Sequence, residues 1–345
     1  MRTVKVCASR IYEVRIGSGL LSTLPHALME VCNARKLAII SDTNVWPLYG
    51  EAIKTSLASA GFHVVNFVFP AGEEQKNAGT YLDIVNFLAE NKLTRSDALI
   101  ALGGGVVGDI TGFAAATYLR GVAYIQIPTT LLAAVDSSVG GKTAIDLPTG
   151  KNLVGAFCQP KLVLCDTDTL NTLPEEIFRD GCAEVIKYGI LYDRALFDHL
   201  MEKGLVFHRE EVIARCVELK RNVVMEDEFD TGARMKLNLG HTIGHGVEAR
   251  SNFGLSHGKA VAIGTAIVAR SACPAEVRDP ILQILERFGL PTATDYAAED
   301  LFSYTLSDKK RSGGTVNLII PEAIGHCSIV PTPVENLLSF IQAGL

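Results

Sequence analysis

The sequence has no long apolar segment. No stretch of its 345 residues reaches the roughly 18 consecutive apolar residues that a membrane-spanning helix needs. Residues 1–14, MRTVKVCASRIYEV, also lack the apolar core of a secretion signal. We therefore expect a cytoplasmic protein with no membrane partner.

The sequence also lacks an excess of basic residues and any paired-cysteine motif. Its net charge of −6 argues against a nucleic-acid partner. The eight cysteines form no C-x-x-C pair and mostly lie in apolar runs, so we expect reduced core residues instead of a zinc or disulfide framework. Hydrophobic residues at 48% and charged residues at 20% are typical of a globular protein, and the length allows two domains.

The first half of the chain alternates between strand-like and helix-like patterns. Each strand-like run is short, apolar and rich in β-branched residues, and the helical patterns lie between such runs. This alternation predicts a mostly parallel sheet covered by helices. The expected strands cover residues 36–41, 63–69, 98–102 and 124–127, and the expected helices cover 50–60 and 79–90.

The second half is mainly helical in pattern. Pro174, Glu175 and Glu176 suit the first turn of a helix that continues through Glu184 and Lys187. We therefore predict an α/β domain over residues 1–173 and a helical domain over 174–345. Further helices are expected over 210–225, 241–250, 258–271 and 280–288, with a late strand at 316–320.

The densest functional signal is the glycine-rich block from Gly103 to Asn152. Its first glycines follow an apolar strand and precede a helical pattern, so backbone N–H groups at the helix start could bind a phosphate. The run GGGVVG satisfies G-x-G-x-x-G, but three consecutive glycines differ from the usual dinucleotide turn. A close-packed turn without a ligand remains the alternative.

Three of the eight histidines lie close together in the sequence. His241 and His245 are four positions apart, which places both rings on one helix face where they could bind one metal ion. His257 and the acidic Glu184, which lies in an apolar stretch, could complete such a site. The spacing alone favours His241 and His245 as the ligand pair. The alternative is a helix that carries two surface or hydrogen-bonded core histidines.

Several basic residues lie near glycines and small side chains, where a ligand can approach closely. Any one of them could be an ordinary solvated cation, but as a set they favour an anionic substrate. They are Arg120, Lys142, Lys151, Lys187, Lys220, Arg234 and Lys309.

With these residues assembled, the sequence strongly resembles the 3-dehydroquinate synthases, a family of sugar phosphate cyclases. The resemblance runs from Pro70 to Lys310, and its most specific segments are GGGVVGD, IPTTLLAAVDSSVGGKTAID, GKNLVGAF, CAEVIKYGIL, LNLGHTIGH and LSHGKAVAIG. It implies an N-terminal α/β domain with a Rossmann-like, mostly parallel sheet that binds NAD, and a mainly helical C-terminal domain. It also implies an active site in the cleft between them.

The same resemblance implies a role for each matched residue. Glu184, His241 and His257 become the ligands of one divalent ion, zinc or cobalt, while His245 becomes a catalytic group on the substrate side. The implied NAD contacts are Asp42, Glu73, Lys76, Gly103, Gly104, Gly105, Val106, Val107, Gly108, Asp109, Thr129, Thr130, Leu132, Lys142, Lys151 and Thr172. The implied catalytic and substrate contacts are Asp136, Lys142, Asn152, Lys187, Lys220, Arg234, Asn238, His245 and Lys309, with Arg120 reaching the partner subunit of a homodimer.

The resemblance also implies a reaction on a phosphorylated sugar acid. In this family NAD⁺ transiently oxidises 3-deoxy-D-arabino-heptulosonate 7-phosphate with help from the metal ion. Phosphate is then eliminated, the hydride is returned, and the ring opens and closes to 3-dehydroquinate, an intermediate of the shikimate pathway to chorismate and the aromatic amino acids.

Three other functions fit parts of this pattern. Another sugar phosphate cyclase, making 2-deoxy-scyllo-inosose or an epi-valiolone, would alter the run VDSSVGGK at 135–142, which is intact here. A metal-dependent alcohol or glycerol dehydrogenase would share the glycine turn and the two-domain plan, and would form NADH. A non-catalytic NAD-binding protein would not need the full set of candidate ligands and lysines.

Overall fold

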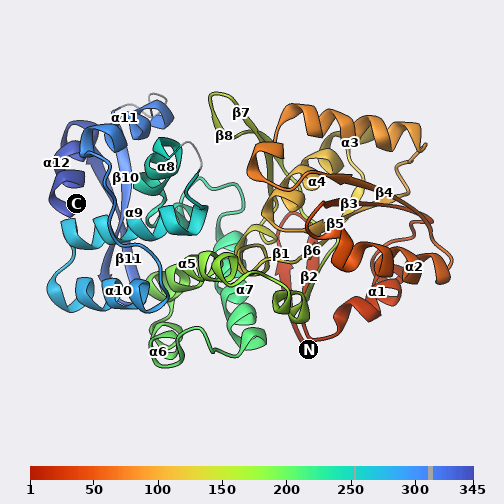
Figure 1. Cartoon of the computed structure of the whole chain (residues 1–345), viewed down its shortest axis with the longest axis horizontal. Coiled ribbons are helices and arrows are strands. Elements are labelled where there is room, and N and C mark those ends of the chain that lie inside the picture. Colours follow the sequence, from red (N-terminus) through yellow and green to blue (C-terminus); the bar gives the residue numbers. More distant parts are fainter. Residues whose placement is uncertain (252–253, 310–313) are drawn as a thin grey trace. The chain divides into compact units, whose positions relative to one another are not determined.

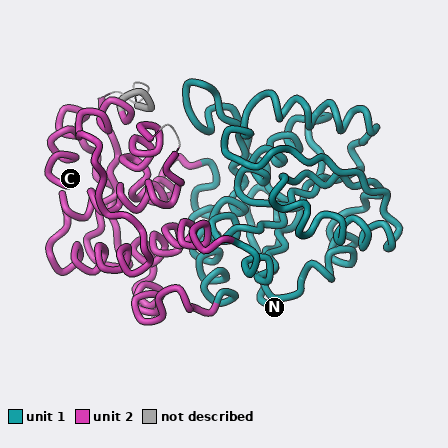
Figure 2. Tube along the Cα trace, in the orientation of Figure 1, with its two compact units in different colours: residues 1–173, 209–229 teal, residues 174–208, 230–345 magenta. Residues whose placement is uncertain are grey.

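The chain forms two compact units. The computed structural model describes residues 1–251, 254–309 and 314–345, with the backbone alone for 306–309. Unit 1 comprises Met1–Leu173 and Arg209–Phe229, and unit 2 comprises Pro174–His208 and Asp230–Leu345 (Figure 2). In the described part of the chain, no helix is long and apolar enough to cross a membrane.

Unit 1 is built on a seven-stranded sheet (Figure 1). The strand order is β1-β2-β9-β6-β5-β3-β4, with β1 and β2 antiparallel and the other neighbours parallel. The prediction of a mostly parallel, Rossmann-like sheet is confirmed. The strands are β1 (Arg2–Cys7), β2 (Ile11–Gly17), β3 (Lys36–Asp42), β4 (His63–Phe69), β5 (Ala98–Gly103), β6 (Ala123–Pro128) and β9 (Leu162–Asp166).

Helices cover both faces of this sheet because its inner strands are apolar on both sides. In β3, Leu37 and Ile39 belong to the core cluster beneath the first two helices, while Ala38 and Ile40 face the cluster of the next two. In Figure 1 one pair of helices lies above the strands and the other below. The helices are α1 (Leu24–Val31), α2 (Glu51–Ser59), α3 (Ala78–Glu90) and α4 (Gly105–Thr117).

A second hairpin, β7 (Lys142–Leu147) and β8 (Gly150–Phe157), occupies the end of the glycine-rich block. The sequence pattern does not predict these strands, because glycines in such a block are typical of turns and loops. Gly155 in fact permits close pairing, since a Cβ on it would lie 2.2 Å from the carbonyl oxygen of Thr143.

Unit 2 is mainly helical. Its first helix begins at Glu175, directly after Pro174, with both predicted acids in its first turn. The helix expected at 280–288 begins earlier, at Ala275, with Pro280 inside it. Burial of Val277 and Ile281 offsets the backbone hydrogen bond that the proline removes. The elements are α5 (Glu175–Tyr192), α6 (Arg194–Lys203), α8 (His241–Arg250), α9 (His257–Ala272), α10 (Ala275–Arg287), α11 (Ala298–Lys309), α12 (Val334–Gly344) and the hairpin β10 (Thr315–Ala323) and β11 (His326–Pro333).

Helix α7 (Arg209–Glu226) belongs with unit 1, although it lies in the second half of the sequence. It packs against β1 and against the π-helical turn η5 (Ala133–Ser137). The predicted boundary at 173/174 is also a boundary between the units, but the helix then inserts back into unit 1. The other short turns are η1 (Leu20–Thr23), η2 (Trp46–Gly50), η3 (Glu73–Gln75), η4 (Tyr118–Arg120), η6 (Thr167–Asn171) and η7 (Ala233–Asn238).

The cysteines are all free thiols. Five of the eight are buried and Cys7 is exposed. Burial raises the pKa of Cys165 to about 12 and that of Cys273 to about 11, so these thiols stay protonated and unreactive at neutral pH.

Candidate functional site

Glu184, His241 and His257 lie together in unit 2. The Nε2 atoms of His241 and His257 lie 3.5 and 3.4 Å from Glu184 Oε1. One possible ligand atom from each of the three residues falls within 4.8 Å of the others. Because two imidazole nitrogens and a carboxylate oxygen are the donors that Zn²⁺ and similar ions take, this cluster could hold one divalent ion.

Close helix packing brings these three side chains together. Glu184 lies in the buried stretch of α5, and the two histidines are the first residues of α8 and α9. A Cβ on Gly264 of α9 would lie 2.0 Å from the carbonyl oxygen of Gly240, the residue before α8. Since larger residues would force the backbones apart, the glycines let both helices begin beside the same carboxylate.

In each histidine, Nδ1, the ring nitrogen that does not face Glu184, also has a polar neighbour. The Nδ1 atom of His241 lies 3.0 Å from the carbonyl oxygen of Leu239, and that of His257 lies 3.8 Å from Glu248 Oε2. In a neutral imidazole, the form that binds a metal ion, a donor bond from Nδ1 leaves the lone pair on Nε2, and Nε2 is the atom that faces Glu184. Glu248, only 3% exposed, was missed by sequence reasoning. Its place two helical turns after His241 on α8 is the signal that could have found it.

The buried charges of the cluster are balanced by neighbours. Burial lowers the pKa of His241 to about 3, and the Lys187 ammonium acts in the same direction. Burial also opposes charge on His257, but hydrogen bonds to Glu184 and Glu248 outweigh it and raise the pKa of His257 to about 10. Glu184 also forms an ion pair with the buried ammonium of Lys187, so positively charged partners are favoured beside this carboxylate.

His245 lies one turn after His241 on α8. Its ring centroid is 5.5 Å from that of His241 and 6.4 Å from that of His257. Among the described residues, the three-residue metal cluster contains Glu184 and His257 but leaves His245 out. The four-residue spacing that favoured His241 and His245 as a pair therefore does not correspond to the tightest group in the structure.

The glycine turn in unit 1 has the expected strand-turn-helix form. Strand β5 ends at Gly103, Gly104 is the N-cap residue, and α4 starts at Gly105. A Cβ on Gly103 would lie 2.5 Å from Val107, so packing alone already requires that glycine. The first N–H groups of α4 have no intrahelical partner, and such groups bind phosphate in many proteins. The turn can thus accept an anion.

A polar network joins Lys76, Asp109 and Asn152 in unit 1. The ammonium of Lys76 lies 2.6 Å from Asp109 Oδ2 and 2.6 Å from Asn152 Oδ1. Asn152 has a φ of 56°, and its N–H donates to Asp146 Oδ1 at 2.7 Å. Burial raises the pKa of Asp109 in spite of Lys76, and attraction to Asp109 and Glu73 raises that of Lys76 against burial. The network fixes the turn of the β7–β8 hairpin beside α4.

Other predicted nucleotide contacts also lie in unit 1. Lys151 pairs with Glu73 at 3.2 Å. Asp42, at the end of β3, accepts the N–H groups of Asn44 and Val45. Thr172 shares a 2.5 Å hydrogen bond with the hydroxyl of Tyr49. Thr129, Thr130 and Leu132 follow β6, next to the glycine turn.

The predicted substrate contacts are divided between the units. In unit 1, Lys220 on α7 binds the carboxylate of Asp136 and also its carbonyl oxygen, at 2.8 Å. Lys142 begins β7, and Arg120 is exposed with a left-handed φ of 64°. In unit 2, Arg234 is buried in η7 and Asn238 ends that turn. Lys309 ends α11, but its side chain, like all of Lys310, lies outside the described part of the structure.

Comparison with known proteins gives concordant results for both halves of the chain. A family model described as 3-dehydroquinate synthase N-terminal matches residues 66–180, and one described as 3-dehydroquinate synthase C-terminal matches residues 181–311. A 3-dehydroquinate synthase of Streptococcus suis (strain 05ZYH33) is 43% identical over 343 residues, covering 96% of this chain and 97% of its own.

Two solved structures are similar over the whole length. One is a 2-deoxy-scyllo-inosose synthase complexed with carbaglucose-6-phosphate, NAD⁺ and Co²⁺, with a TM-score of 0.88, 26% identity and full coverage of both chains. The other is a 2-epi-5-epi-valiolone synthase from Streptomyces hygroscopicus subsp. jinggangensis 5008 with NAD⁺ and Zn²⁺, with a TM-score of 0.87, 28% identity and 99% coverage of both. Both structures contain NAD⁺ and a divalent metal ion.

Proposed function

Because this chain belongs to the 3-dehydroquinate synthase family, we propose that it converts 3-deoxy-D-arabino-heptulosonate 7-phosphate into 3-dehydroquinate and phosphate. The observation that carries the proposal is the match of both family halves, from residue 66 to residue 311. The chemistry is that of a carbon–oxygen lyase, since phosphate leaves by elimination before the ring closes. Its product would feed the synthesis of chorismate and the aromatic amino acids.

The residues of unit 2 fit a divalent ion. Glu184 is fully buried, and both histidines direct Nε2 toward it, so we assign the ligands as Glu184, His241 and His257. Two nitrogen donors and one oxygen donor suit zinc and cobalt alike. Glu248 would hold the ring of His257, as carboxylates do for many metal-bound imidazoles.

The residues of unit 1 fit NAD. The N–H groups at the start of α4 would bind the pyrophosphate. The network of Lys76, Asp109 and Asn152 would hold the β7–β8 hairpin in place beside α4. When bound, NAD⁺ would accept a hydride from the substrate and return it, while the divalent ion would act as a Lewis acid on neighbouring substrate oxygens.

The remaining polar residues would bind and orient the substrate. Lys187, Lys220 and Arg234 are buried cations that would recognise the carboxylate and phosphate of a sugar acid. Asp136 holds Lys220 through its carboxylate and its carbonyl oxygen, which fixes the ammonium before substrate arrives. His245 would exchange protons with substrate hydroxyls next to the metal ligands. Lys142, Asn152, Asn238, Lys309 and Arg120 complete the proposed substrate set.

One assay distinguishes this function from its rivals. Metal-loaded protein is incubated with NAD⁺ and the heptulosonate phosphate, and phosphate, dehydroquinate and absorbance at 340 nm are measured together. We expect equal amounts of phosphate and dehydroquinate with no net NADH, because the cofactor is restored in each turnover. Net NADH without phosphate would indicate a polyol dehydrogenase. Phosphate without dehydroquinate would reject the proposed product.

We also expect a homodimer. Strand β8 is hydrogen-bonded to β7 in a two-stranded sheet, and it exposes Leu153, Val154 and Phe157. An exposed apolar strand edge favours pairing with an identical edge in a two-fold dimer. Sedimentation equilibrium should therefore give about twice the 37.1 kDa chain mass, and Val154→Lys should shift the mass toward one chain. A monomeric wild-type protein would contradict this expectation.

A further inference from the structure

We propose that Asp180 is a positioning residue for the metal ligand His257, because it caps the first turn of α9 from the neighbouring helix α5. The inference rests on the proposed function only in taking Glu184, His241 and His257 as the ligands of a divalent ion. It concerns a residue outside that set.

The start of α9 is capped from another helix. Ser256 occupies the N-cap position, yet its side chain makes no capping hydrogen bond within α9. Instead its hydroxyl donates to Asp180 Oδ1 at 2.5 Å, and the same oxygen accepts the N–H of Lys259 at 2.9 Å. Lys259 is the third residue of α9, whose N–H an N-cap side chain normally satisfies. The carboxylate of Asp180 performs that role.

His257 lies between Ser256 and Lys259, the two residues that bind Asp180. Ser256 precedes it and Lys259 follows two residues later, so Asp180 holds the backbone on both sides of the ligand. On the same turn, a Cβ on Gly258 would lie 2.0 Å from the carbonyl oxygen of Asp180, which means that the two backbones are in contact. The first turn of α9 therefore has little room to move relative to α5.

Asp180 also links His257 to its fellow ligand Glu184. The two acids are one helical turn apart on α5, so they lie on the same face of that helix. Asp180 binds the backbone of α9, and Glu184 Oε1 lies 3.4 Å from Nε2 of His257. The distance between the two ligands is thus set by a bond one turn away. Loss of that bond would leave both ligands present but less well aligned.

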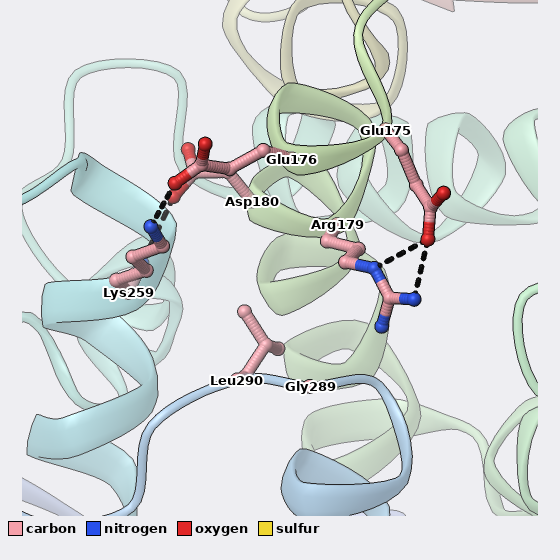
Figure 3. Close-up of a pocket in the computed structure, with 7 residues that line it drawn as sticks. All are labelled: Glu175, Glu176, Arg179, Asp180, Lys259, Gly289 and Leu290. Carbon is pink, nitrogen blue, oxygen red and sulfur yellow. Dashed lines mark hydrogen bonds and ion pairs between the residues drawn. The ribbon is translucent and has the colours of Figure 1, made fainter.

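A nearby acid provides a matched control. Glu176, one turn before Asp180, forms an ion pair with the side chain of Lys259, and both acids lie on the side of α5 that faces Lys259 (Figure 3). They line a surface hollow of about 340 Å³. The Glu176 side chain is 75% exposed, and it contacts the Lys259 ammonium, whereas Asp180 contacts the backbone N–H of Lys259. Exposed ion pairs of this kind contribute little to folding stability.

The test compares metal affinity among variants of the full-length protein. The visible absorption of bound Co²⁺, titrated against a competing chelator, reports the dissociation constant and the ligand geometry, and thermal unfolding of the metal-free protein reports any general loss of stability. Asp180→Ala should weaken Co²⁺ binding about 10-fold, the lower end of the loss caused by removing a hydrogen-bond partner of a ligand, because Asp180 contacts the backbone around His257 and not its ring. Asp180→Asn keeps an oxygen that can accept both bonds, so its affinity should stay within about 3-fold of wild type. Glu176→Ala should change it less than about 2-fold.

Each outcome decides the matter. Unchanged Co²⁺ affinity in Asp180→Ala would overturn the proposal, even if the metal-free variant unfolds at a lower temperature. A loss in Asp180→Asn as large as that in Asp180→Ala would assign the effect to charge and would also overturn it. If Asp180→Ala does not fold, Ser256→Ala, which removes one of the two bonds, should still weaken binding about 3-fold. A wild-type protein that binds no Co²⁺ would instead overturn the ligand assignment of the proposed function.

Discussion

His257→Ala should abolish stoichiometric metal binding and phosphate release, whereas His245→Ala should lose phosphate release alone. The first change removes one of the three possible donors in the group of Glu184, His241 and His257. It should cost far more than the roughly 10- to 100-fold loss of metal affinity expected for an outer partner. The second removes a ring outside that group. Metal content after dialysis and phosphate release are measured on the same samples.

Glu248→Gln provides a graded comparison for the same site. Its amide would keep the size of the carboxylate beside Nδ1 of His257 but not its charge, so the metal should be retained with about 10-fold weaker affinity. Full activity in His257→Ala would reject the ligand assignment. Loss of metal from His245→Ala would restore the pair that the four-residue spacing suggested.

Lys76→Met should strongly destabilise unit 1. It would leave the largely buried Asp109 carboxylate and the Asn152 amide without the ammonium that lies 2.6 Å from each. Breaking a buried ion pair by removing one partner typically costs about 3–5 kcal/mol, and we expect the lower end because Asp109 can take up a proton. The free energy of unfolding is obtained from urea titration of the metal-free, NAD-free protein.

This loss of stability should depend on pH. Burial already raises the pKa of Asp109 above its usual value, and removal of Lys76 would raise it further. The folded variant then binds a proton more tightly than the unfolded chain, so its unfolding free energy falls as pH rises above about 4. The difference in unfolding free energy between wild type and Lys76→Met should therefore be larger at pH 7.5 than at pH 5.

Two further variants test the origin of this effect. Asp109→Asn added to Lys76→Met should recover part of the loss, because no buried charge then lacks a partner. Arg2→Met, which removes exposed ion pairs with Glu210 and Glu211, should cost about 0.5 kcal/mol or less. A deficit below about 1 kcal/mol in Lys76→Met, or one that does not change with pH, would show that the network is not the anchor we describe.

Local patterns predicted much of the fold. The apolar runs located β3, β4, β5 and β6 to within a residue or two, and proline followed by two acids marked the start of α5. These features depend on neighbours within a few positions. By contrast, the β7–β8 hairpin depends on close pairing at Gly155, and the place of α7 depends on contacts with β1 more than 200 residues earlier. No local pattern contains that information.

The site divides in the same way. The glycines of the βα turn and the three histidines stand out in the sequence because of their spacing. Glu248 and Asp180 do not, because each acts on a histidine through a contact that only helix packing creates. The spacing of His241 and His245 favours a pair that differs from the tightest group of possible ligands, because helix periodicity does not indicate which ring a second helix approaches.

The insertion of α7 into unit 1 has a consequence for how the chain folds during its synthesis. Unit 1 stays incomplete until residue 229 has been made, although its first segment ends at residue 173. At about 5–20 residues per second, this interval lasts roughly 3 to 11 seconds. Throughout it, the side of β1 that α7 covers has no partner. The nascent N-terminal half would therefore need protection from aggregation, and a fragment cut at residue 173 would keep that apolar surface open permanently.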